Sequence, residues 1–317
     1  MEIIEITAQE YEKTVGQDIP VFSRKDFLEL NSKKVDKIYY LVGKDSKRRF
    51  AFAVGSKNNE WLAPFSAPFS NIVLLKKNIT IDQIWSFIIA LNLFAKAENA
   101  QSINICLPAN TYNEQTNVRL INALLGNGYK MLYCDVNYSL NLNNICLDNY
   151  ATSINQKARR NLKIALNNNL QLIHCDSFED KSKAYDIIKK NREYRGFPLR
   201  MTKAQLMETI QIVDHDFFIV KVNNTELAAA VVYHTMSDVA QVVYWGNLPE
   251  TERYKPINYL AFKLIEFYKK QDFKLLDIGT STEEGIPNYG LCTFKESVGC
   301  NASMKARFKI DFKERTT

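Results

Sequence analysis

Apolar runs separated by polar turn sequences predict strands throughout the first half of the chain. Lys37–Gly43 and Arg49–Gly55 read as two such strands, and Asp45-Ser46-Lys47 between them predicts a hairpin turn. Trp61–Ser66 is expected to form a third strand. The other elements expected in this half are a helix at Ser23–Leu30 capped by Ser23, a helix at Ile81–Glu98 after Thr80, a buried strand at Gln101–Pro108, a helix at Thr116–Gly126 and a long strand at Lys130–Leu142.

The second half repeats this order of elements. Asn223-Asn224 and Met236-Ser237-Asp238 are turn sequences that separate three strands, and Gly196-Phe197-Pro198 separates two helices. The elements expected here are helices at Ile154–Asn168, Asp180–Arg195, Lys203–Val213, Pro256–Lys270 and Tyr289–Val298, and strands at Leu170–Cys175, Asp216–Val222, Leu227–His234, Val239–Gly246, Lys274–Ile278 and Ser303–Phe312.

The repeated order predicts a duplicated architecture in an α/β protein of the α+β type, with mixed sheets. A single hydrophobic core seldom serves 317 residues, so we expect two domains, residues 1–148 and 149–317. Antiparallel strands followed by strand, helix and strand do not describe a doubly wound fold. Neither G-x-G-x-x-G after a strand nor G-x-x-x-x-G-K-[ST] occurs, which disfavours the nucleotide-binding folds that carry them.

Net charge and cysteine content limit the ligands, metals and cell compartment that we expect for this chain. The net charge of +6, from 41 basic and 35 acidic residues, suits a phosphate-bearing small molecule or a lipid-linked substrate, or else merely a soluble surface. We expect no DNA partner. The six cysteines lack the spacing of a zinc site, so no metal is expected, and they fit a reducing cytoplasm. We see no signal peptide and no apolar run long enough to span a bilayer.

Four segments of the second half carry a resemblance to a known family. They are Lys157–Ala165, a basic helix, then Tyr194–Pro198, Leu276–Gly279 and Phe294–Gly299. Their order and spacing over residues 150 to 312 resemble the Fem-type aminoacyltransferases of the acyl-CoA N-acyltransferase (GNAT) superfamily. The first half resembles the N-terminal domain of that family in its element order alone. The resemblance implies two tandem GNAT-like domains, the second of them catalytic.

The resemblance also implies transfer of an acyl or aminoacyl group to an amine. In Fem enzymes the donor is aminoacyl-tRNA and the acceptor is a peptidoglycan precursor, while relatives are thought to acylate amino sugars. Acyl-CoA is the other donor that the superfamily uses. No long charged heptad stretch occurs here, so aminoacyl-tRNA is the less favoured of these two donors. A non-catalytic ligand-binding module that keeps the double fold is the alternative.

Two residues are candidates for the chemistry. Asp277 ends a strand before Gly279 and is expected either to take the proton of the attacking amine or to cap a turn. The resemblance assigns Lys295 to a phosphate or carboxyl group in the cleft, and the alternative is a surface lysine beside a core phenylalanine. No nucleophile constellation is present, so direct attack without a covalent intermediate is expected.

Donor and acceptor contacts are expected in separate segments. The donor loop 248–258 has no glycine, unlike the usual pyrophosphate loop, but it places cations just before a helix N-terminus. The expected donor-binding residues are Tyr244, Trp245, Arg253, Tyr254, Lys255 and Asn258, and the expected acceptor-binding residues are Arg159, Arg160, Arg195 and Phe294. Each set has a purely structural alternative. The three histidines, His174, His215 and His234, show no catalytic spacing and are expected to be structural.

Overall fold

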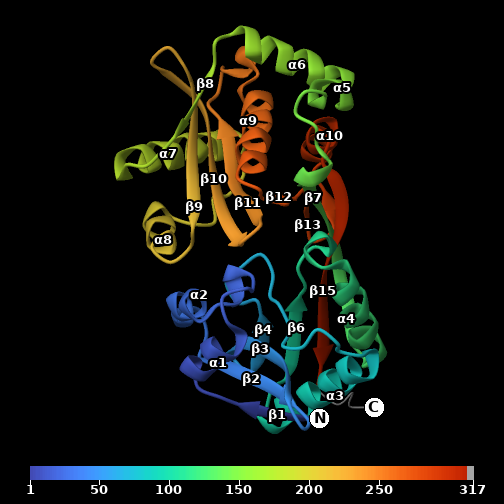
Figure 1. The fold of residues 1–317 in the computed structure, drawn as a ribbon. Coiled ribbons are helices and arrows are strands. Elements are labelled where there is room, and N and C mark those ends of the chain that lie inside the picture. Colours follow the sequence, from blue (N-terminus) through green and yellow to red (C-terminus); the bar gives the residue numbers. More distant parts are fainter. Residues whose placement is uncertain (313–317) are drawn as a thin grey trace. The chain divides into compact units, whose positions relative to one another are not determined.

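The computed structural model describes residues 1–312, which divide into two compact units (Figure 1). Unit 1 comprises Met1–Val136 and Thr282–Ile286 together with the described residues from Ser303 onward. Unit 2 comprises Asn137–Ser281 and Pro287–Ala302. The chain therefore passes from unit 1 to unit 2, returns to unit 1 over Thr282–Ile286, re-enters unit 2 and comes back to unit 1 at Ser303.

Unit 1 is built on a mixed sheet. Its strands pair in the order β1-β2-β3-β4-β6-β15, with β4 and β6 parallel and the other neighbours in this order antiparallel. Its elements are β1 (Glu2–Glu5), α1 (Ala8–Val15), α2 (Lys25–Leu30), β2 (Lys37–Lys44), β3 (Arg48–Lys57), β4 (Glu60–Ala63), β5 (Val73–Leu74), α3 (Ile81–Ala97), β6 (Ser102–Cys106), α4 (Glu114–Gly126), part of β7 (Lys130–Asn141), β13 (Thr282–Glu283) and most of β15 (Asn301–Asp311).

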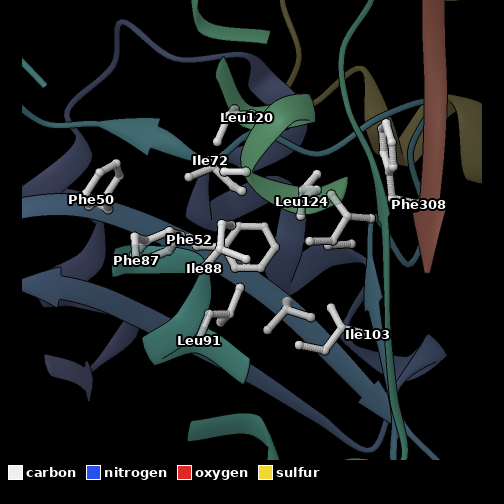
Figure 2. Close-up of a cluster of buried hydrophobic side chains, with 14 of the residues drawn as sticks. Phe50, Phe52, Ile72, Phe87, Ile88, Leu91, Ile103, Leu120, Leu124 and Phe308 are labelled. Atoms are coloured by element: carbon white, nitrogen blue, oxygen red, sulfur yellow. The ribbon is translucent and has the colours of Figure 1, made fainter. Parts of the chain in front are cut away.

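Side-chain alternation on β3 gives unit 1 a hydrophobic core on each face of its sheet. Phe50 and Phe52 point to one face, where they pack with Phe87 of α3 and Leu124 of α4 (Figure 2). Ala51 and its neighbours on the other face belong to a second cluster with residues of α1 and α2. Successive strand residues point to opposite faces, so one strand serves both layers of helices.

Unit 2 repeats the pattern. Its strands pair in the order β8-β9-β10-β11-β12-β7, with β11 and β12 parallel and the other neighbours antiparallel. Its elements are α5 (Tyr150–Ser153), α6 (Gln156–Asn167), β8 (Gln171–His174), α7 (Phe178–Tyr194), α8 (Lys203–Thr209), β9 (His215–Val222), β10 (Thr225–Met236), β11 (Val239–Asn247), α9 (Pro256–Lys270), β12 (Leu275–Thr280), α10 (Tyr289–Ser297) and the second half of β7, while β14 (Ile286–Pro287) spans the unit boundary.

The two faces of the unit 2 sheet carry different helices. Phe218 of β9 lies opposite Ala230 of β10, which lies opposite Trp245 of β11, so these three share a face. The ring of Phe218 contacts Phe267 and Tyr268, which places α9 on that face. The neighbouring residues, including Tyr244, point to the other face, against which α7 packs.

Each sheet is completed by a strand from the other half of the sequence. In unit 1, Arg307 of β15 pairs with Cys106 of β6. In unit 2, Asn141 of β7 pairs with Leu275 of β12. The compact units therefore differ from a division at residues 148/149, because residues 137–148 lie in unit 2 and the described residues from Ser303 onward lie in unit 1.

Most of the expected elements are present, but some expectations are wrong and some elements were not expected. Ser23 does not cap α2: it ends a 3₁₀ turn (Val21–Ser23), is buried, and leaves Arg24 at the N-cap. Strand β1 and helix α1 were not expected, since Glu2–Glu5 is too short to show a period. Helix α8 ends at Thr209 rather than Val213. Further 3₁₀ turns occur at Ser32–Lys34, Asn110–Tyr112, Leu142–Asn144 and Glu252–Tyr254.

Candidate functional site

The parallel strands β11 and β12 of unit 2 separate part-way along their length. Their ladder consists of three residue pairs and ends where Gln241 lies opposite Asp277. Strand β11 continues to Asn247 and β12 to Thr280, and in the described residues these extensions do not pair with each other. The sheet therefore opens between the two strands just beyond Asp277.

A backbone irregularity lies on each side of this opening. On β11, Val242 and Tyr244 lie opposite consecutive residues of β10, so Val243 is bulged. On β12, Asp277 and Gly279 lie opposite consecutive residues of β7, so Ile278 is bulged. Gly279 has φ of +76°, a conformation that side-chain-bearing residues rarely adopt. Bulges take backbone groups out of the ladder and re-aim side chains, as at many binding sites.

Asp277 is buried below the opening, with 1% of its surface exposed. Its Oδ1 accepts hydrogen bonds from Asn137 Nδ2 at 2.8 Å and from the Gly279 backbone N–H at 2.9 Å, and its Oδ2 accepts from Gln241 Nε2 at 2.8 Å. The carboxylate thus fixes the β12 bulge. The role of Asp277 as the base stays a prediction. Because three donors already occupy its carboxylate, a substrate amine contacts Asp277 directly only after one of these donors moves.

Lys295 of α10 is buried, 1% exposed, so the alternative of a surface lysine is wrong. Its Nζ donates to the backbone carbonyls of Ile278, Gly279 and Thr280 at 2.9, 2.8 and 3.0 Å. These carbonyls belong to the bulged end of β12, so an ammonium group with three donors satisfies them together. A substrate phosphate or carboxyl group contacts this Nζ only by replacing one of them.

The electrostatics of Lys295 suit proton transfer near neutral pH. Burial lowers the pKa of Lys295 to about 8, and the negative charge of Asp277 acts against that drop. The three carbonyl acceptors also favour the protonated form. An ammonium group with a pKa close to the working pH is well matched to donate a proton.

Aromatic side chains flank the opening on one face of the sheet. The rings of Trp245 on β11 and Phe294 on α10 meet edge to face, with centroids 5.8 Å apart. The ring centroid of Tyr138 on β7 lies 5.7 Å from Lys295 Nζ, and the Tyr138 hydroxyl donates to Glu296 Oε1 at 2.7 Å. The structure therefore brings Trp245, expected at the donor, next to Phe294, expected at the acceptor.

The loop expected to bind the donor is held by its own hydrogen bonds. Asn247 Nδ2 donates to the Leu248 carbonyl at 3.0 Å and to Thr251 Oγ1 at 3.2 Å. Lys255 has φ of +53° and precedes Pro256, the first residue of α9, while Arg253 Nη2 donates to the Tyr254 hydroxyl at 2.8 Å. Asn258 lies in the first turn of α9 and is half-buried. The cations expected at the donor thus lie immediately before a helix N-terminus.

Known structures match the fold over nearly the whole chain. FemX matches with a TM-score of 0.71 at 15% identity over 98% of both chains. The C-terminal domain of a provisionally named lysylphosphatidylglycerol synthetase from Agrobacterium fabrum matches with a TM-score of 0.61 at 10% identity, covering 96% of this chain and 92% of that one. A tandem GNAT protein of the clavulanic acid pathway matches with a TM-score of 0.54 at 8% identity over 98% of both.

The chain has the tandem GNAT fold. This confirms the expected fold class and the structural side of the family resemblance. No family model matches the sequence, and no curated protein does either. At these low identities the similarity establishes the fold alone, so the chemistry rests on this chain's own residues.

Within the tandem GNAT fold, the three arginines expected at the acceptor do not lie together. Arg159 and Arg160 are exposed on α6, whose residues from Gln156 to Asn167 include four cations and no acidic residue. A shallow hollow of about 620 Å³ is lined by Gln156, Lys157, Arg159, Arg160 and Lys163. Arg195 is the exposed C-cap residue of α7.

The residues that sequence reasoning missed are those that hold the site. Asn137 and Gln241 anchor Asp277, and they come from β7 and β11, which are far from it in sequence. A polar residue within a strand, such as Gln241 in Val239–Asn247, is a weak signal that it has a buried partner. Sequence reasoning also did not single out Arg192 of α7, whose Nε is buried in the structure.

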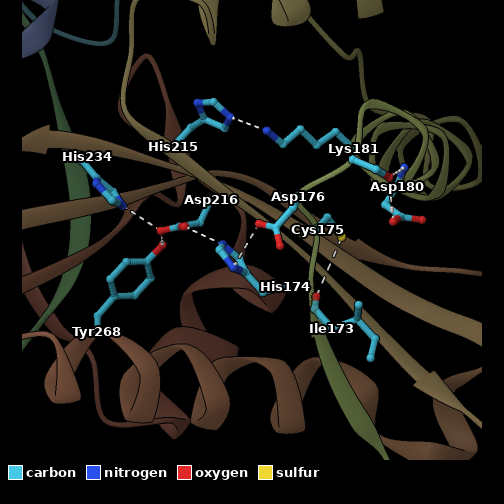
Figure 3. A network of polar contacts seen from close by, with 11 residues as sticks. Ile173, His174, Cys175, Asp176, Asp180, Lys181, His215, Asp216, His234 and Tyr268 are labelled. Carbon is cyan, nitrogen blue, oxygen red and sulfur yellow. Dashed lines mark hydrogen bonds and ion pairs between the residues drawn. The ribbon is translucent and has the colours of Figure 1, made fainter.

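A second polar cluster lies on strands β8, β9 and β10 of unit 2 and includes Tyr268 of α9 (Figure 3). Asp216, 8% exposed, accepts from Nε2 of His174 and of His234, each at 2.7 Å, and from the Tyr268 hydroxyl at 2.7 Å. The described residues contain no group of three or more His, Cys, Asp or Glu that could hold a metal ion. None of the helices within residues 1–312 is both long and apolar enough to cross a bilayer.

Proposed function

We propose that the chain is an N-acyltransferase that moves an acyl or aminoacyl group to an amine of a cell-envelope precursor or amino sugar. The observation that supports it best is the opening between β11 and β12, with a bulge on each side and Lys295 bound to the bulged end of β12. The donor carbonyl would lie in this opening, where backbone groups freed by the Val243 bulge act as an oxyanion hole.

The proposed reaction is direct attack. The acceptor nitrogen forms a bond to the carbonyl carbon, and the bond from that carbon to the donor sulfur or oxygen breaks. One N–H of Lys295 turns from a β12 carbonyl to the departing thiolate or alkoxide and gives it a proton, which its pKa of about 8 allows near neutral pH, and a proton returned through water restores the ammonium group. The proton of the attacking amine leaves through water, and Asp277 keeps the bulge in place and Lys295 charged.

Acyl-CoA and aminoacyl-tRNA are the two proposed donors. The names of the neighbours include a lysylphosphatidylglycerol synthetase and FemX, which favours a lipid-linked or cell-wall acceptor bearing phosphates. Both donors are cytoplasmic molecules, so we place the reaction in the cytoplasm. The exposed cations of α6 would meet the acceptor phosphates.

Calorimetric titration with acetyl-CoA and with a longer acyl-CoA tests the donor. We expect one-to-one binding that weakens at least about tenfold when Arg253 and Lys255 are both replaced by alanine, since two cations before the α9 N-terminus would contact the donor's phosphates. Lys263→Gln is the matched control, because this lysine lies farther along the same helix and pairs with Glu266. Absence of binding at millimolar CoA ligands would reject the CoA donor and leave aminoacyl-tRNA.

Removing the α6 cations tests the acceptor. Arg159→Gln with Arg160→Gln should lower affinity about tenfold for either phosphatidylglycerol vesicles or a uridine diphosphate amino sugar, and added salt should weaken the wild-type interaction. Vesicles and nucleotide sugar are titrated separately, so the result identifies the kind of acceptor. Lys270→Gln, which removes an exposed cation already paired with Glu266, is the control. Equal binding by the double variant and the wild type to both probes would refute a role for α6.

One observation favours a non-catalytic ligand-binding module instead. The donor loop lacks glycine, and hydrogen bonds among Asn247, Leu248 and Thr251 fix its conformation. If neither CoA nor charged tRNA binds while the acceptor probes do, this alternative replaces the enzyme.

A further inference from the structure

An open pocket lies beside α7, on the side of the unit 2 sheet opposite the Trp245–Phe294 pair. It is a hollow of about 570 Å³, within the range of small-molecule sites. Its residues come from the C-terminal half of α7, the connecting loop and the start of α8 (both helices are labelled in Figure 1). Tyr244 points toward this side: burial raises its pKa, and the charge of Arg192 acts against that rise.

The loop that closes the pocket is fixed at both ends. The Phe197 backbone N–H donates to the Arg192 carbonyl at 2.9 Å, and the Tyr185 hydroxyl donates to the Met201 carbonyl at 2.9 Å. Asn191 on α7 donates from Nδ2 to the Asn247 carbonyl of β11 at 2.8 Å, which attaches the helix to the sheet. The pocket is thus a built feature of unit 2 whose walls are held by defined hydrogen bonds.

Two of the three cations that line the pocket are paired with lining carboxylates, and the third is not. Lys203 Nζ pairs with Asp186 at 2.7 Å, and Lys189 pairs with Glu193 at 3.7 Å. Arg192 is the remaining charged lining residue, and no ion pair to it is found within residues 1–312. Its Nε is buried and has no hydrogen-bond partner in the same residues. A guanidinium nitrogen that is buried without a partner costs free energy, which an acceptor on a bound ligand would offset.

The rest of the lining defines the ligand. Phe197, Pro198, Leu199 and Met201 offer apolar surface beside the guanidinium. One uncompensated positive charge matches a monoanion better than a doubly charged phosphate, and a guanidinium binds a carboxylate with two parallel hydrogen bonds. We infer that this pocket binds an organic carboxylate with an apolar body, held by Arg192. The inference does not require the chain to transfer an acyl group.

Nuclear magnetic resonance of the arginine Nε–H groups in the full chain tests this directly. The Arg192 signal is assigned by its loss in Arg192→Gln. Hexanoate and N-acetylleucine, added up to about 50 mM, should shift it saturably with dissociation constants of about 1 mM, as expected for small fragments. Hexanamide has the same apolar body without the charge and should not shift it. Equal effects of hexanoate and hexanamide, no shift at all, or tighter binding of inorganic phosphate would each overturn the inference.

Thermal unfolding separates binding from folding. Arg192→Met keeps an unbranched apolar side chain as far as the position of Nε and removes the partnerless buried nitrogen, so its midpoint should equal or exceed that of the wild type while hexanoate binding disappears. Lys190→Gln, an exposed cation on the same helix outside the pocket, should keep both properties. A clear drop in the midpoint for Arg192→Met would show that Arg192 serves the fold and would refute the proposed site.

Discussion

Replacing Lys295 with methionine is expected to lower the transfer rate at least about 100-fold and the free energy of unfolding by about 2–4 kcal/mol. The methionine fills similar space but leaves the carbonyls of Ile278, Gly279 and Thr280 without the donor that they share. Denaturant unfolding followed by circular dichroism measures the stability, and product formation with the donor found by calorimetry measures the rate.

Two further variants make the Lys295 result interpretable. Thr293→Ala changes an exposed position on the same helix and should leave both quantities unchanged. Lys295→Arg keeps the charge but not the compact ammonium geometry, so it should recover part of the stability and little of the rate. If the methionine variant were as stable and active as the wild type, the three hydrogen bonds to β12 would have neither of the roles assigned to them.

Replacing Asp216 with asparagine is expected to cost about 2–3 kcal/mol of stability at neutral pH. Hydrogen bonds from His234, Tyr268 and His174 lower the pKa of Asp216 to about 2 despite its burial. Because the folded pKa lies below the unfolded value, this contribution is present above about pH 4 and is lost as the pH falls toward 2. Urea unfolding of wild type and variant at pH 7 and at low pH measures it.

Asp176 provides the matched control for Asp216. Both carboxylates approach His174, but Asp176 lies 3.6 Å from Nδ1 and its side chain is 89% exposed, whereas that of Asp216 is 10% exposed. Asp176→Asn should therefore change stability by less than about 0.5 kcal/mol. A difference between wild type and Asp216→Asn that stays constant from pH 7 to pH 2 would contradict the linkage to this carboxylate.

The fold was predictable because the local signals agree with one another. The apolar runs in Lys37–Lys44 and Arg48–Lys57, with a polar turn between them, specify the β2–β3 hairpin, and Pro256 marks the start of α9. Ser23 failed because neighbouring Val21 and Phe22 are drawn into the core, so that burial overrides the capping preference. The strand partners of β7 and β15 were not predictable, since pairing over such sequence separations leaves no local pattern.

Only short segments of the candidate site could be predicted from the sequence. Asp277 and Lys295 were named from short segments, and the structure puts both at the end of β12. The carbonyls that bind Lys295, and the amides of Asn137 and Gln241, have no signature in sequence because tertiary contacts alone bring them together. Arg192 illustrates the same limit, since whether an arginine has a partner is decided by its surroundings in the fold.

The exchange of β7 and β15 between the units has a consequence for synthesis on the ribosome. The β6 edge of unit 1 gains its partner β15 only when Asn301–Asp311 has been made, although β1 to β6 end at Cys106. Until then β6 presents an open edge, which invites pairing with another nascent chain. A messenger truncated before residue 301 would release a chain with that edge uncovered, so chaperone dependence and aggregation should persist while residues 107–300 are made and fall once β15 has emerged.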